Sequence, residues 1–104
     1  MKVFASAAIL AAMAAASLAA ADAANGKTIF DRSCKGCHGA DGTPNPAMAK
    51  VMTIPDLKSN EVQSLSDADI KNIIENGKGK MRPIKSVSGA GADDVAAYVH
   101  TLRK

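Results

Sequence analysis

The sequence contains very few aromatic residues. It has no tryptophan, one tyrosine and two phenylalanines in 104 residues, and Phe4 lies in an N-terminal segment set apart from the rest. A chain this small buries little apolar surface, and such domains usually depend on disulfides, a metal or another bound group. The scarcity of large apolar side chains therefore indicates either a core completed by a bound group or a marginal or oligomeric domain.

Cysteine and excess charge are also scarce. The two cysteines are too few for a framework of several disulfides. Thirteen Lys and Arg against ten Asp and Glu leave a net charge of +3. That charge is too small for a nucleic-acid-binding surface, and no aromatic residues are interleaved with the basic ones. We therefore expect no nucleic-acid partner.

The two cysteines stand together in the run Cys34-Lys35-Gly36-Cys37-His38. A Cys-x-x-Cys-His run is the pattern that attaches a c-type haem. Each thiol adds to one vinyl group of the porphyrin, and the adjoining imidazole lies close enough to bind the iron. The motif predicts one haem c, covalently bound through Cys34 and Cys37, with His38 as an axial iron ligand.

Three other interpretations of this motif are weaker. A redox-active dithiol is expected after a buried strand, and nothing before Cys34 has a strand pattern. A structural zinc site needs more ligands than one cysteine pair, His38 and the distant His100 provide. A disulfide between Cys34 and Cys37 would close too short a loop to stabilise much, and it leaves His38 unexplained.

The N-terminus has the pattern of a secretory signal peptide, which we assign to residues 1–23. Lys2 supplies the positive start, residues 3–21 are uncharged and rich in alanine, and Ala21-Asp22-Ala23 is a small-x-small site. The pattern predicts cleavage after Ala23, a single domain over residues 24–104 and a periplasmic location. An uncleaved anchor is the alternative, but alanine is weakly apolar and no basic cluster follows directly.

The remaining chain has helical patterns and no sustained period-two alternation, so we expect an all-α domain. One helix begins with Asn25 as N-cap and continues to the motif, with Gly26, Phe30 and Cys34 on one face. Residues 39–65 have a loop-like composition, with a short helix expected over residues 47–52.

Two further helices are expected after this loop region. Ser66 and Asp69 form a capping-box pattern that begins a helix ending at Asn76-Gly77. The last helix begins near Gly91 or Ala92 and continues to the C-terminus. Its expected inward stripe consists of Val95, Tyr98, Val99 and Leu102.

Beyond the haem motif, several features resemble a small bacterial class I c-type cytochrome. They are Gly26 and Phe30 before the motif, Pro55-Asp56-Leu57, Met81 after a Gly/Lys run, and the helix of residues 94–99. The resemblance implies the cytochrome c fold, in which loops wrap the haem and the first and last helices cross. Gly26 would permit that crossing, with Phe30 and Tyr98 in contact beside it.

The resemblance also implies a second axial ligand, which we assign to Met81. Met81 follows a glycine-rich run and precedes Pro83, although Arg82 stands where many relatives have proline. Met52 is the second choice. The family further implies that a carbonyl of Pro44 or Pro46 orients His38. His100 is expected to be solvated on the polar side of the last helix.

The predicted function is that of an exported one-electron carrier, not an enzyme, because iron bound on both faces offers no open site. Its partners are expected to be redox proteins with an acidic docking surface, and no stable membrane insertion is expected after cleavage. A haem-based sensor of small ligands and a docking subunit of a larger redox complex are the alternatives. The basic residues expected around the haem edge are Lys35, Lys50, Lys78, Lys80, Arg82 and Lys85.

Overall fold

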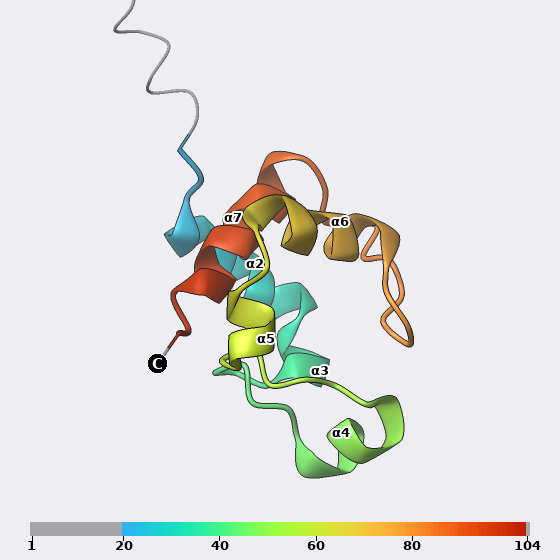
Figure 1. Cartoon of the computed structure of the whole chain (residues 1–104). Helices are drawn as coiled ribbons and strands as arrows, with labels where there is room; N and C mark the ends of the chain where they lie inside the picture. The colour runs from blue at the N-terminus through green and yellow to red at the C-terminus, as the bar shows by residue number, and fades with distance from the viewer. Residues whose placement is uncertain (1–19, 104) are drawn as a thin grey trace, which may run out of the picture.

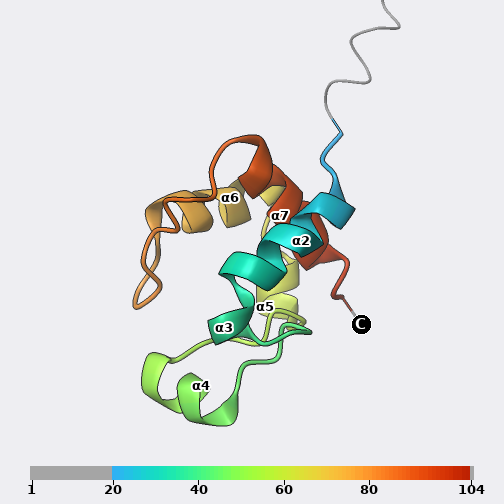
Figure 2. The same ribbon diagram turned by 180° about the vertical axis from the view of Figure 1, so that it is seen from behind.

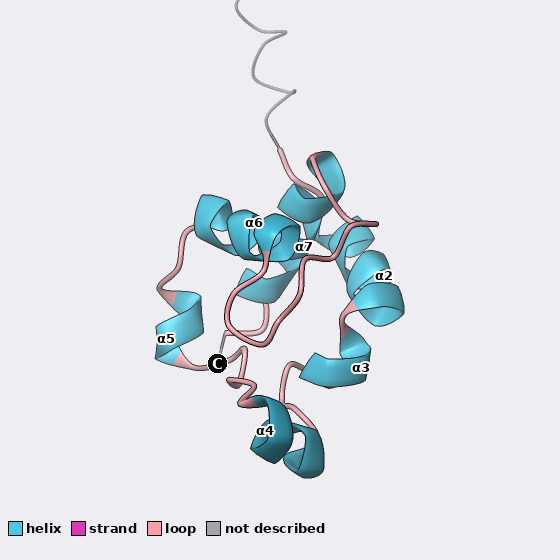
Figure 3. Ribbon diagram, turned by 90° about the vertical axis from the view of Figure 1, so that its right-hand side faces the viewer, coloured by secondary structure: helices cyan, strands magenta, loops and turns pink. Residues whose placement is uncertain are grey.

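The structure, a computed structural model, describes residues 20–103, so most of the predicted signal peptide lies outside the described residues. Within residues 20–103 the only extended pairing is an isolated bridge between Lys78 and Met81, which confirms the predicted all-α class (Figure 3). The helices are α2 (Ala23–Ser33), α3 (Lys35–His38), α4 (Pro46–Met52), α5 (Asn60–Gln63), α6 (Asp67–Asn76) and α7 (Ala90–His100).

Helices α2 and α7 cross in close contact, as predicted (Figure 1). Gly26 is buried at the crossing, and a Cβ atom there would overlap the backbone carbonyl of Asp94. The rings of Phe30 and Tyr98 meet beside it, with centroids 5.2 Å apart and planes tilted by 58°. Such a pair contributes about 0.5–1.5 kcal/mol beyond its buried area. The crossing therefore depends on the missing side chain of Gly26.

Helix α2 begins earlier than predicted. Asp22, not Asn25, is its N-cap, and the Asp22 carboxylate accepts a hydrogen bond of 3.1 Å from the backbone N–H of Asn25. Asn25 lies inside the first turn, where its side chain donates to Asp94 Oδ2 over 2.8 Å. The predicted cap was wrong because both residues favour N-cap positions, and Asp94 of α7 binds the backbone N–H of Asp22 and the side chain of Asn25.

Helix α6 matches its predicted pattern. Ser66 and Asp69 form the reciprocal capping box, and the helix ends at Gly77, whose φ of 82° favours glycine. Ile70 and Ile74 are buried against the core. Helix α7 begins at Ala90, slightly before the predicted start, and ends at His100 instead of continuing to the C-terminus.

The region predicted as loop contains a helix that the sequence pattern missed. Helix α4 was predicted and is capped by Asn45, but the four-residue α5, capped by Ser59, was not. A single turn carries no apolar stripe that periodicity could detect. From α5 the buried side chain of Gln63 donates to the carbonyls of Leu57 and Val99, at 2.8 and 2.9 Å. Gln63 thus links the loop region to α7.

His100 is only partly exposed and contacts two neighbouring groups, which corrects the prediction of a solvated side chain. Its side chain is 24% exposed, with Nδ1 2.7 Å from Asp67 Oδ1 and Nε2 2.9 Å from the carbonyl oxygen of Leu65. The segment joining α5 to α6 covers this side of α7, which helical periodicity alone did not indicate (Figure 2). His100 therefore fastens the end of α7 to the start of α6.

Replacing Gly26 by alanine should destabilise the fold by about 1–3 kcal/mol or more, because the added methyl group forces α2 and α7 apart. Thermal unfolding of the haem-loaded protein measures the effect. Gly91→Ala is the matched control, since a Cβ at Gly91 meets only Ile29 Cδ1 at an ordinary 3.5 Å. Equal melting temperatures for the two variants would contradict the close crossing.

Candidate haem pocket

The core surrounds a large apolar cavity of about 1030 Å³. The volume lies at the upper end of the range for small-molecule and cofactor sites. This is the space that the scarcity of large side chains predicted. Its apolar lining includes Phe30, Leu57, Val62, Leu65, Ile70, Ile73, Ile74, Ile84, Val95 and Val99.

All four predicted site residues line this one cavity: Cys34, Cys37, His38 and Met81. Cys34 caps the C-terminal end of α2, where its N–H donates to the carbonyl of Phe30 over 2.8 Å. The carbonyl of Cys34 then accepts from the N–H groups of Cys37 and His38, at 3.2 and 3.0 Å. The single turn of α3 therefore brings both sulfurs and the imidazole to the cavity.

The cysteines lack the features of a redox dithiol. Both are free thiols; Cys34 is half-buried and Cys37 is exposed. Burial, with a smaller contribution from Cys37, raises the pKa of the Cys34 thiol to about 11. A dithiol oxidoreductase needs a lowered thiol pKa. Among residues 20–103, no three His, Cys, Asp or Glu side chains gather as a metal-binding group.

The environment of His38 suits a neutral metal ligand. Burial lowers the pKa of the imidazole, and the ring of Phe30 lies 6.5 Å from it. Neutral imidazole is the form that binds metals. Its Nδ1 atom is buried without a hydrogen-bond partner, so neither Pro44 nor Pro46 accepts from it in this structure. Because Nδ1 is enclosed by protein, Nε2 is the nitrogen that could bind iron. Together with the two thiols and the thioether of Met81, this imidazole forms a set of donors that fits haem c.

Met81 reaches the cavity from a tight turn after α6. Lys78 and Met81 exchange two backbone hydrogen bonds of 2.9 Å, and Gly79 at the corner has a φ of 58°. Gly77 permits this path, because a Cβ there would lie 2.7 Å from the Met81 carbonyl oxygen. Of the other candidates, Met52 also lines the cavity, whereas Met48 is 37% exposed.

Sequence reasoning missed two contacts that hold the loops around the cavity. The ammonium of Lys80 donates to the carbonyl of Val51 in the last turn of α4, over 3.0 Å. Lys58 binds Thr43 and lies 3.6 Å from Asp41 Oδ2. In each contact the two residues are far apart in sequence, so no local sequence pattern predicts it. The first joins the Met81 turn to α4, and the second joins the loops that follow α3 and α4.

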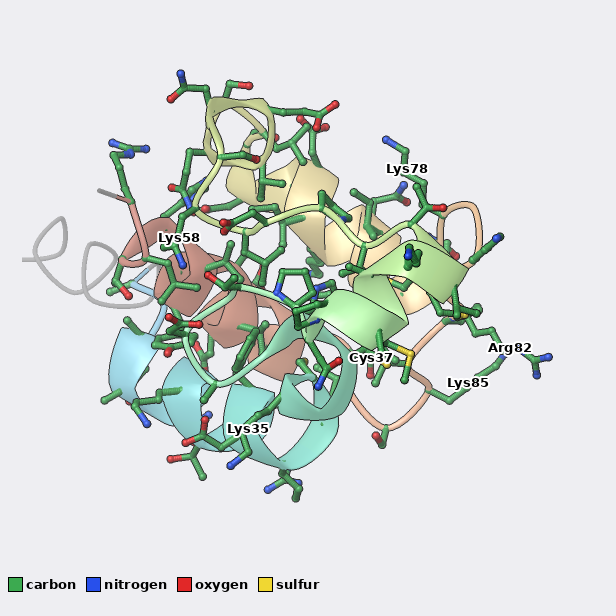
Figure 4. All side chains as sticks on the ribbon, turned by 90° about the horizontal axis from the view of Figure 1, so that it is seen from below. Lys35, Cys37, Lys58, Lys78, Arg82 and Lys85 are labelled. Atoms are coloured by element: carbon green, nitrogen blue, oxygen red, sulfur yellow. The ribbon has the colours of Figure 1, made fainter. Side chains whose placement is uncertain are left out.

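The expected basic surface is only partly assembled. Lys78, Lys80 and Arg82 line the rim of the cavity, whereas the other three expected residues do not. In Figure 4, Lys78, Arg82 and Lys85 lie on one side of the molecule and Lys35 lies away from them. The cationic patch around the cavity thus comes mainly from the Met81 turn.

Comparison with known proteins shows that this chain is similar to cytochromes c. Residues 21–99 match the family described as cytochrome C oxidase, cbb3-type, subunit III. Cytochrome c6 from Synechocystis sp. is 42% identical over 77% of this chain, which spans 65% of that protein. Cytochrome c6 from Rippkaea orientalis is 40% identical over 77% of this chain and 70% of its own length. Cytochrome c-554(547) from Halothiobacillus neapolitanus is 32% identical over 81% of this chain and all of its own.

The fold is also similar to that of a solved structure. The c-type cytochrome KustC0563 superposes with a TM-score of 0.66 at 26% identity, covering 76% of this chain and 98% of its own. No helix within residues 20–103 is long and apolar enough to cross a membrane. The chain therefore belongs to the cytochrome c family, as a small all-α class I member whose cofactor is a covalently bound haem c.

Proposed function

We propose that this protein is an exported monohaem one-electron carrier, with haem attached through Cys34 and Cys37 and iron bound axially by His38 and Met81. One observation carries the proposal. A single apolar cavity receives an imidazole from α3 and a thioether from the turn after α6, with both thiols beside the imidazole. That is the donor set of a closed, low-spin electron-transfer centre.

The bound haem supplies an iron that gains or loses one electron. The chain would contribute two neutral ligands, His38 and Met81, from a mostly apolar lining. A methionine thioether together with a histidine imidazole would favour the reduced state and raise the potential. Glu61 is the one carboxylate among the described lining residues, so the pocket offers no paired acid and base for substrate chemistry.

Export is supported by the N-terminal pattern of Lys2 followed by an uncharged, alanine-rich run. The export pathway delivers the chain to the periplasm and removes this segment, and the residues that follow form the haem domain. The relatives named cytochrome c6 support the electron-transfer role. The partner we propose is a redox protein whose acidic surface meets Lys78, Lys80 and Arg82 in a small, brief interface.

Met81→Ala should open the sixth coordination position. The weak methionine-to-iron charge-transfer band of the ferric protein should disappear, and the reduced protein should bind carbon monoxide readily, whereas the wild type binds it poorly. Met48→Ala, on the exposed face of α4, is the control and should change neither. Persistence of the band in Met81→Ala and its loss in Met52→Ala would reassign the ligand. Ready binding of carbon monoxide by the wild type would favour the sensor function.

Lys80→Leu should loosen Met81 by releasing its turn from the carbonyl of Val51. A hydrogen bond of this kind contributes about 0.5–1.5 kcal/mol, so carbon monoxide should bind the reduced protein about two- to tenfold more tightly. Lys78→Leu removes the same charge from the same turn and serves as the control. Equal affinities in the two variants would show that charge, and not the contact with α4, is responsible.

Electron transfer to an acidic redox protein should slow as salt is added, because screening weakens attraction between exposed charges. Stopped-flow rates at increasing ionic strength measure this dependence. Arg82→Gln should reduce both the low-salt rate and the salt slope, and Lys35→Gln, on another side of the molecule, should change them less. Rates independent of salt in all three proteins would refute electrostatic docking.

A further inference from the structure

Asp22, the residue before α2, is bound into the helix crossing by three hydrogen bonds. Its carboxylate accepts from the N–H of Asn25, and its carbonyl accepts from the N–H of Gly26 over 2.9 Å. Its own backbone nitrogen donates to Asp94 Oδ1 over 2.7 Å. Asp22 therefore both caps α2 and connects the start of α2 to α7.

Asp94 receives these contacts at the point where α2 and α7 are closest. One carboxylate oxygen accepts from Asp22 and the other from Asn25 Nδ2, at 2.7 and 2.8 Å. These two hydrogen bonds, the one from Asp22 being the stronger, hold the pKa of the Asp94 carboxyl below its usual range. The backbone carbonyl of the same residue packs on Gly26. The contacts of Asp22 thus belong to the crossing itself.

The sequence alone does not decide where the signal peptide is cut in this region. The small-x-small rule is met by Ala21-Asp22-Ala23 and equally by Ala19-Ala20-Ala21. A cut after Ala23 would remove the cap and all three hydrogen bonds, leaving the first turn of α2 without its side-chain acceptor. Of the described residues, a cut before Asp22 would remove at most Ala20 and Ala21, which are exposed and non-helical.

The geometry points to cleavage on the N-terminal side of Asp22, so that the mature protein keeps Asp22 as the cap of α2 and as the partner of Asp94. This inference rests on the proposed export of the chain and moves the cleavage site upstream of Ala23. A cut directly after Ala21 would also turn the amide nitrogen that contacts Asp94 into an ammonium group. The hydrogen bond would then become an ion pair at the end of the chain.

The intact mass of the exported protein tests the inference directly. The full chain is produced in a host competent for cytochrome c maturation, and the periplasmic product is weighed with its haem. A first residue at Ala20, Ala21 or Asp22 supports the inference. A first residue at Ala23 or later, or an uncut chain beginning at Met1, overturns it. A colourless product overturns the proposed function, so the two failures are distinguishable.

A comparison of two start points tests the physical reason. A foreign signal peptide is joined so that the holoprotein begins at Asp22 in one form and at Ala24 in the other. Loss of an N-cap typically costs enough to lower the melting temperature of a domain this size by about 4–8 °C. We expect that difference between the two forms, and equal melting temperatures would overturn the inference.

Substitution of Asp94 in both forms completes a double-mutant cycle, which measures the coupling between Asp22 and Asp94. Asp94→Asn should lower the melting temperature at neutral pH in the form that begins at Asp22, and much less in the form that begins at Ala24. Because the carboxyl pKa is lowered in the folded state, its contribution should disappear as pH falls through that pKa. Asp31→Asn, whose carboxylate pairs with Lys27 on the exposed face of α2, should act equally in both forms. Equal effects of Asp94→Asn in both forms would refute the coupling.

Discussion

The close approach of α2 and α7 at Gly26 is the constraint on which the haem pocket depends. With no side chain at this position, the carbonyl of Asp94 packs directly on α2, and the rings of Phe30 and Tyr98 meet one turn further along. Because α2 leads into α3 within one residue, the angle of the crossing determines where Cys34 and His38 point. Another wall of the pocket is built on α6, which also packs against α7.

A chain with so few large side chains cannot fill the space between these helices with its own residues. The helices leave an apolar cavity of about 1030 Å³, and the chain has no tryptophan, one tyrosine and two phenylalanines. A covalently held macrocycle supplies the missing apolar contact, so the cofactor is part of the core as well as the redox centre. The loops enclose the cavity, and single contacts such as that of Lys80 with Val51 hold them in place.

Much of the fold followed from local patterns. The capping box of α6, the short α4 and the inward stripe of α7 were predicted, since caps and periodicity act within a few residues. The errors have a common origin. Asp22 replaced Asn25 as a cap because α7 binds both, and His100 is engaged because the α5–α6 connection lies over it. The N-cap of α2 and the contacts of His100 both depend on residues that are distant in sequence.

The sequence by itself determined the cofactor, because the pattern that attaches a haem c needs only the five consecutive residues from Cys34 to His38. It determined the all-α class for the same reason, since helical periodicity is local. Only the tertiary structure decided that Met81 and Met52 share the cavity with His38 while Met48 does not. It alone decided that Asp22 belongs to the folded domain. Both outcomes follow from how separate segments pack around one cavity and one helix crossing, and a linear pattern does not encode that geometry.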